Sequence, residues 1–174
     1  DRQSVQLNFV LNGADGTVNG KYSWNKDDTE LTFVPDAPLA RGVSHTLNMG
    51  TGAKSKSGMP LGNEYSAVLR TYENLAVSST ETEARSVSFR FTAPLKDTDF
   101  EELVTISPAM DNLLVDVYES DMYLYNLEPG TNYVIELSDK ITDQFGQSLG
   151  TPFRLEVQTA PMAPNLYVIP FVSP

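Results

Sequence analysis

Hydrophobic and polar residues alternate along most of the chain, and this alternation predicts β-strands. It is strongest at Val87, Phe89 and Phe91, which are separated by polar residues. A period of two residues is typical of a strand that buries one face. The apolar positions of the predicted strands are Leu7, Phe9, Leu11, Tyr22, Trp24, Leu31, Phe33, Leu47, Met49, Tyr65, Ala67, Leu69, Val87, Phe89, Phe91, Val104, Ile106, Val115, Val117, Tyr133, Ile135, Leu137, Phe153, Leu155 and Val157.

Turn residues separate these segments. Asn12 and Gly13 follow the first strand, and residues 25–28 connect the two strands of a predicted hairpin. Residues 122–125 are bulky at every position, so the pattern does not show which face of this strand is buried. A helical period is absent except for one short turn expected at residues 97–102, where acidic side chains gather as in a first helical turn. Many short strands joined by turns predict an all-β protein of antiparallel β-sandwiches.

The two halves of the chain repeat one another. Residues 42–49 align with residues 130–137, an offset of 88 positions (from 42 to 130). Residues 57–62 align with residues 145–150 at the same offset, so that three glycines of each half stay in register. A repeat of this length indicates two domains of one type rather than a solenoid of short units.

The repeat also predicts the domain boundaries and an incomplete first domain. In the second domain, residues 75–91 precede the stretch that matches residues 1–11. The first domain has no counterpart of residues 75–91. We therefore expect a first domain truncated at its N-terminus, with an exposed strand edge. The expected divisions are residues 1–72, residues 73–160 and a Pro-rich tail or the start of a further domain at residues 161–174, with a linker near residues 72–74.

The tail contains a strand-like segment, residues 165–169, that has no place in either repeat. An unpaired strand edge is a template for strand addition. We expect this tail, or a strand from a neighbouring molecule, to cover the open edge of the first domain in a strand-exchanged homodimer. The alternative is that the first domain rearranges its remaining strands and leaves the tail unpaired.

Composition and charge narrow the classes of function. The net charge is −11, from 12 basic and 23 acidic residues, which argues against nucleic-acid binding because a phosphate backbone needs clustered cations. The chain has no cysteine and one histidine, which excludes disulfides, thiolate metal sites and multi-histidine zinc sites. The apolar fraction of 40% is enough for a core. No 20-residue apolar span occurs, because prolines interrupt the longest uncharged stretch.

The acidic charge is concentrated in one half of the chain. Residues 1–72 hold seven basic and seven acidic side chains, whereas residues 73–174 hold five basic and sixteen acidic ones. Solubility explains such a surface, and a docking face for a basic partner is the alternative. Asp116, Glu119 and Asp121 are the carboxylates that we expect to form that face.

No residue is assigned as catalytic, metal-binding or cofactor-binding. No Gly-x-Ser-x-Gly turn occurs to supply a serine nucleophile for His45, so we expect His45 to be a packing residue. The acidic residues Asp27 and Asp28, Asp97 to Glu102, and Asp139 with Asp143 lack the ligand spacing of a calcium loop. Core packing explains the alternating aromatic side chains, and the alternative is a sugar-binding platform, for which the candidates are Trp24, Tyr118, Tyr123 and Tyr125.

Residues 127–133, Leu-Glu-Pro-Gly-Thr-Asn-Tyr, resemble the approach to a strand in fibronectin type III and bacterial Ig-like domains. There a tyrosine hydroxyl bonds back to the loop backbone, which is the tyrosine-corner arrangement. The resemblance implies this role for Tyr133, and His45 occupies the equivalent position of the first repeat. It also implies that both sandwiches are Ig-like or fibronectin-type-III-like.

Further stretches resemble the same bacterial Ig-like module, at residues 31–35, 37–42, 57–62, 87–91 and 104–108. Such pairs are similar to the N-terminal region of bacterial alpha-2-macroglobulin-like proteins, whose members trap proteases. This chain lacks the cysteine of a thioester, so the resemblance implies scaffold rather than trap.

The resulting interpretation is a non-enzymatic scaffold or spacer fragment of a larger bacterial envelope protein, periplasmic or surface-exposed. Its expected partners are other domains of the parent protein, and through the parent a protease or a surface partner. The alternative is an adhesin or carbohydrate-binding surface module. An enzyme is the second rival, disfavoured because the sequence offers no nucleophile with a base. No cofactor is expected.

Overall fold

The computed structural model describes residues 1–162, and it is an all-β protein built of antiparallel sheets. The predicted fold class, antiparallel β-sandwiches, is confirmed. The chain divides into two compact units, Asp1–Asn74 and a second unit that begins at Leu75. The strand predicted at residues 165–169 lies outside the described residues. Within residues 1–162, no helix has the length and apolar character needed to span a membrane.

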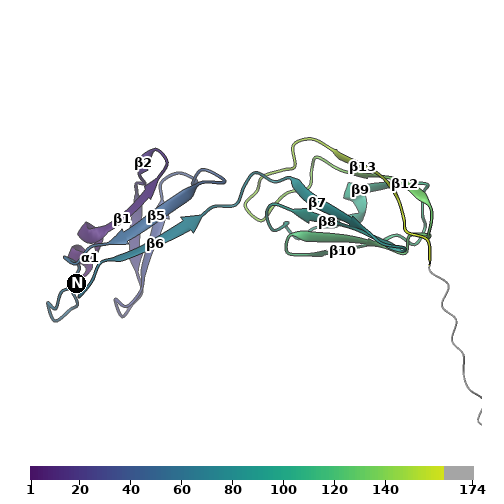
Figure 1. Cartoon of the computed structure of the whole chain (residues 1–174). Coiled ribbons are helices and arrows are strands. Elements are labelled where there is room, and N and C mark those ends of the chain that lie inside the picture. The colour runs from purple at the N-terminus through teal and green to yellow at the C-terminus, as the bar shows by residue number, and fades with distance from the viewer. Residues whose placement is uncertain (163–174) are drawn as a thin grey trace, which may run out of the picture. The chain divides into compact units, whose positions relative to one another are not determined.

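The second unit is a two-layer sandwich (Figure 1). One sheet has the strand order β10-β11-β8-β7 and the other has the order β13-β12-β9. The strands are β7 (Val77–Thr82), β8 (Ser86–Phe91), β9 (Val104–Ser107), β10 (Leu114–Tyr118), β11 (Asp121–Tyr125), β12 (Asn132–Leu137) and β13 (Phe153–Gln158). Except for β7, which is mostly polar and was not predicted, and β11, whose face the pattern left ambiguous, these strands fall on the predicted apolar alternations, because each turns apolar positions toward the facing sheet.

The core of this unit is fully enclosed. Met122 and Leu124 are buried, so the ambiguous segment turns these two side chains inward and Tyr123 and Tyr125 outward. The remaining buried hydrophobic residues are Leu75, Val87, Phe89, Phe91, Ala93, Leu95, Phe100, Val104, Leu127, Tyr133, Ile135, Leu137 and Ile141. The expected helical turn is present as a short 3₁₀-helix, η1 (Glu101–Leu103).

The first unit contains a four-stranded sheet and a separate hairpin. The sheet has the order β2-β1-β5-β6, and the hairpin pairs β3 with β4 as predicted, with Tyr22 opposite Phe33 and Trp24 opposite Leu31. The strands are β1 (Phe9–Gly13), β2 (Gly16–Thr17), β3 (Gly20–Trp24), β4 (Leu31–Pro35), β5 (Ser44–Met49) and β6 (Tyr65–Arg70).

The first predicted strand is wrong at its start, because Leu7 lies in a helix. Helix α1 (Arg2–Asn8) begins where the Asp1 carboxylate accepts a hydrogen bond from the backbone N–H of Gln3 at 3.3 Å. Leu7 is 75% exposed, so its alternation with Phe9 and Leu11 does not report a shared buried face. Two helical turns are too short to display a period of 3.6 residues.

Positions that match in the sequence repeat also make matching hydrogen bonds in the two units. The hydroxyl of Thr159 donates to the carbonyl of Glu128 at 2.7 Å and accepts from the N–H of Thr131 at 2.9 Å. The hydroxyl of Thr71 makes the same contacts 88 positions earlier, to Ala40 at 2.6 Å and from Val43 at 3.1 Å. The register of β5 on β6 is likewise that of β12 on β13.

The two units differ in how much they bury. In the first unit Leu11 and Ala53 are the buried hydrophobic residues among those described. Phe9, Tyr22 and Phe33 form a cluster of three rings with centroids 5.0 to 5.7 Å apart, and each ring is only partly buried. The hairpin β3–β4 contributes Tyr22 and Phe33 to this cluster and forms a sheet of two strands, whereas the corresponding sheet of the second unit has four strands.

Candidate functional site

His45 is buried in the first unit, with 3% of its surface exposed. Its Nδ1 lies 3.2 Å from the carbonyl oxygen of Val43, and the ring packs against Gly13, where an added Cβ would lie 3.1 Å from it. The second unit forms the expected corner, because the Tyr133 hydroxyl accepts a hydrogen bond from the Glu128 N–H at 3.0 Å. His45 therefore keeps the position of the corner residue but bonds to a nearer part of the chain.

The acidic loops of the second unit use their carboxylates to organise the backbone. Asp143 is buried, and its Oδ1 accepts hydrogen bonds from the N–H groups of Phe145 and Gln147, both at 2.9 Å. Asp99 accepts from the N–H of Glu101 at 3.1 Å, a local side-chain to backbone bond at the start of η1. Among residues 1–162 no three His, Cys, Asp or Glu side chains converge as a metal site would require.

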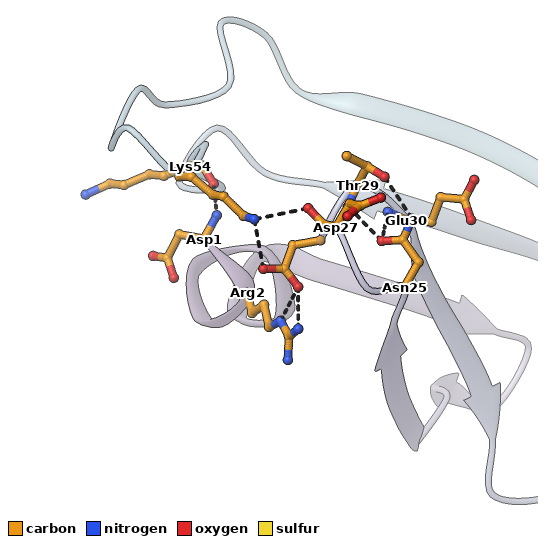
Figure 2. A network of polar contacts seen from close by, with 9 residues as sticks. Asp1, Arg2, Asn25, Asp27, Thr29, Glu30 and Lys54 are labelled. Atoms are coloured by element: carbon orange, nitrogen blue, oxygen red, sulfur yellow. Dashed lines mark hydrogen bonds and ion pairs between the residues drawn. The ribbon is translucent and has the colours of Figure 1, made fainter.

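Figure 2 shows a polar network that joins α1 to the turn of the hairpin β3–β4 and to the loop after β5. Asp28 forms ion pairs with Arg2 and with Lys56, the latter at 3.1 Å. The hydrogen bond from Arg2, followed by that from Lys56, lowers the pKa of the Asp28 carboxyl below its usual value. The N-terminal ammonium donates to the Lys54 carbonyl at 2.7 Å. The network lies at one end of the first unit, and its donors and acceptors bind one another.

The aromatic candidates for a sugar platform separate into two groups. Trp24 does not form an exposed platform, because its Nε1 is enclosed and has no hydrogen-bond partner among the described residues. Tyr123 and Tyr125 project from the outer face of β11 and stack, with centroids 5.9 Å apart and an interplanar angle of 6°. Tyr118, on the neighbouring strand β10, is 71% exposed. Three tyrosines thus lie on one face of the four-stranded sheet.

The expected acidic face lies on the same side of this sheet. Asp116 is opposite Tyr123 and Asp121 is opposite Tyr118 in the pairing of β10 with β11. Asp121 also binds Arg90 of β8 through two hydrogen bonds, at 2.8 and 3.2 Å. Glu119 occupies the turn between the two strands.

Arg90 is the residue of this surface that the sequence pattern did not identify. The hydrogen bond to Asp121, strengthened by its charge, raises the pKa of the Arg90 guanidinium. Arg90 follows the buried Phe89 and so had to point outward, but its partner depends on the register of β8 on β11. The surface therefore combines stacked tyrosines, carboxylates and one paired cation.

Comparison with known proteins gives a partial similarity. No family model matches the chain. The chain is 32% identical over 71 residues to a protein of Nostoc sp. (strain PCC 7120 / SAG 25.82 / UTEX 2576) described as an alpha-2-macroglobulin homolog. The match covers 37% of this chain and 4% of that protein, so the chain spans a small part of the relative's length. The similarity supports a relation to proteins of the alpha-2-macroglobulin type.

Proposed function

We propose that the chain is a non-catalytic structural part of a larger envelope protein of the alpha-2-macroglobulin type. Its two units are proposed to be Ig-like modules that act as scaffold or spacer. The observation that carries this proposal is the duplicated hydrogen-bond pattern at Thr71 and Thr159, since tandem copies of one sandwich are typical of spacer regions. The similarity to the Nostoc protein supports the choice of parent.

The relation to a parent protein is tested by the sequence that flanks residues 1–174 in the gene. Macroglobulin-type domains downstream are the expected result. An array made only of further copies of this module would contradict the proposal and favour an adhesin.

A scaffold role is tested with the purified chain and a panel of proteases. We expect the chain alone to leave protease activity on small and large substrates unchanged, because nothing in its described part resembles a trap. Inhibition or entrapment by the chain alone would overturn the proposal.

Limited proteolysis tests the division into two domains, and the first cut is expected near residues 72–75, the boundary between the compact units.

A second candidate function, carbohydrate binding, is favoured by the stacked pair Tyr123 and Tyr125. Flat aromatic side chains flanked by carboxylates and a guanidinium provide both a stacking surface and hydrogen-bonding groups for a sugar. A glycan array probed with the unmodified chain and with Tyr125→Ala tests it. Tyr72→Ala, an exposed tyrosine of the first unit, is the matched control. Binding that Tyr125→Ala abolishes and Tyr72→Ala preserves would support this candidate.

A further inference from the structure

The outer face of the sheet β10-β11-β8-β7 places one carboxylate among aromatic rings. Asp116 of β10 lies directly opposite Tyr123 of β11, and Leu114 lies opposite Tyr125, which makes Tyr125 a diagonal neighbour of Asp116. Tyr118 follows Asp116 by two residues on β10 and therefore points to the same side of the sheet. Opposite residues have Cβ atoms about 5 Å apart, and diagonal neighbours lie about 7 to 8 Å apart, within reach of aromatic side chains. Asp116 thus has three tyrosines as neighbours on this face.

Asp116 differs from Asp121, the next carboxylate on this face, because it has no cation beside it. Arg90 binds Asp121 at 2.8 and 3.2 Å and compensates its charge. Another ion pair of the second unit joins Arg154 to Glu156 on the opposite sheet. Within residues 1–162 no ion pair involves Asp116, whose side chain is exposed on the edge strand β10. A ligand that lies on the tyrosines would therefore meet an uncompensated negative charge.

Two further carboxylates make the surroundings of the tyrosines negative. Glu119 is exposed in the turn that joins β10 to β11. Glu81 of β7 belongs to the same row of the sheet as Tyr123. The imbalance extends over this half of the chain, since residues 73–174 hold five basic and sixteen acidic side chains. Such a field attracts cationic ligands and repels anionic ones.

We propose that this face binds an oligosaccharide with ammonium groups, a polymer of 2-amino-2-deoxyhexose whose amines are free. The inference rests on the second candidate function, carbohydrate binding, and adds the class of sugar. The apolar C–H face of a pyranose ring lies on Tyr123 or Tyr125, and an ammonium group of the same oligosaccharide donates to the Asp116 carboxylate. A hydrogen bond between two charged groups is stronger than one between neutral groups, and an ammonium beside a tyrosine ring gains cation–π attraction as well.

The same arrangement disfavours the other ligands that could lie here. An anionic sugar would bring its charge beside Asp116, and the guanidinium of Arg90 is already held by Asp121. A neutral sugar could stack on the rings but would cover the Asp116 carboxylate without compensating its charge. A lysine-rich peptide supplies ammonium groups but no broad apolar ring face for Tyr123 and Tyr125, whose planes are nearly parallel at 6°.

The test compares two hexasaccharides that differ in N-acetylation, the chitosan hexamer with free amines and the chitin hexamer with acetamides. Calorimetry with the full chain at about pH 5.5 keeps both amines and carboxylates charged. We expect the free-amine hexamer to bind about tenfold more tightly, because only its ammonium groups make charge-assisted bonds. Equal affinities would overturn the choice of an amino sugar and leave carbohydrate binding in place. Binding of neither hexamer would also overturn it, and an empty glycan array would remove carbohydrate binding as well.

Two single variants locate the charge that selects the ligand. Asp116→Asn removes the carboxylate among the tyrosines. Glu136→Gln removes one charge from the exposed face of β12, in the opposite sheet, and is the matched control. We expect Asp116→Asn to abolish the preference for the free-amine hexamer and Glu136→Gln to preserve it. A preference that survives Asp116→Asn, or that both variants abolish, would overturn the proposal, because the overall negative charge would then explain the binding.

A peptide with the same number of side-chain ammonium groups separates a sugar from a basic protein segment. Hexalysine with blocked termini is expected to bind about tenfold more weakly than the free-amine hexamer, because it lacks ring faces that stack on tyrosine. Tyr125→Ala should weaken the free-amine hexamer by about fivefold and leave hexalysine unchanged. Hexalysine that binds as tightly as the hexamer would identify a basic peptide as the ligand and overturn the proposal.

Discussion

Phe89 and Phe153 meet edge to face across the core of the second unit, with ring centroids 6.1 Å apart and planes at 87°. This contact joins the two sheets of the sandwich, since Phe89 belongs to β8 and Phe153 to β13. Tyr65 occupies the position of Phe153 in the first unit, and no corresponding strand within residues 1–162 covers it there. The same position of the repeat is therefore a core position in one unit and a surface position in the other.

Truncation of these two side chains is expected to have unequal effects. Phe153→Ala should lower the free energy of unfolding of the second unit by about 2 kcal/mol, because a largely covered ring loses its packing. Tyr65→Ala should cost less than about 1 kcal/mol, which is the range of strand propensity alone. Chemical denaturation of the full chain measures both, and similar costs would contradict the difference in coverage.

The hydrogen bond between the Tyr133 hydroxyl and the Glu128 N–H gives a second prediction. Tyr133→Phe should destabilise the second unit by about 1 kcal/mol, because it leaves the N–H without its partner. Tyr125→Phe removes a hydroxyl from an outward-facing ring and is the control. Equal denaturation midpoints for the two variants would show that the corner bond contributes nothing.

Two glycines of the first unit form a matched pair for backbone strain. Gly58 has a φ of +84°, whereas Gly62 does not have a positive φ, and an added Cβ would meet open space at both. Gly58→Ala should destabilise the unit by about 1 kcal/mol, because an L-residue is strained in the left-handed region. Gly62→Ala should be neutral or slightly stabilising. Loss of stability at Gly62 comparable to that at Gly58 would point to a cause other than φ.

The ion pairs of Asp28 give a prediction for pH. Arg2 and Lys56 lower its pKa, so its stabilising contribution is present above the unfolded-state value of about 3.9. The contribution is lost as the pH falls through the lower folded-state value. Asp28→Asn suits the positive φ of 60° at this position and removes the charge. The unmodified chain should be the more stable of the two at pH 7.

This advantage should shrink below about pH 4, where the carboxylate becomes protonated. Denaturation midpoints of both chains between pH 7 and pH 2.5 provide the measurement. Asp27→Asn, at the neighbouring position of the same turn, is the control for a general effect of charge. A difference that stays constant over this range would show that Asp28 does not titrate with its partners.

Most of the strands and turns were predictable because their causes are local, whereas β2 and the mostly polar β7 were not predicted. Alternation at Val87, Phe89 and Phe91 reflects the two faces of one strand and needs no knowledge of the partner. The hairpin of Tyr22 and Phe33 followed from two such segments around a turn. Helix α1 escaped prediction because it is short and its start depends on one capping contact at Asp1.

The sequence by itself determined the all-β class and the 88-position repeat, since both are visible as patterns along the chain, and the resemblance of residues 127–133 implied the tyrosine corner. The tertiary structure decided which face of residues 122–125 is buried, which cations reach Asp28, and that Arg90 pairs with Asp121. It also decided that Tyr65 is exposed where Phe153 is covered. These outcomes depend on strand order and register between distant segments, and the hydrophobic period of a single strand does not specify which strand pairs with it.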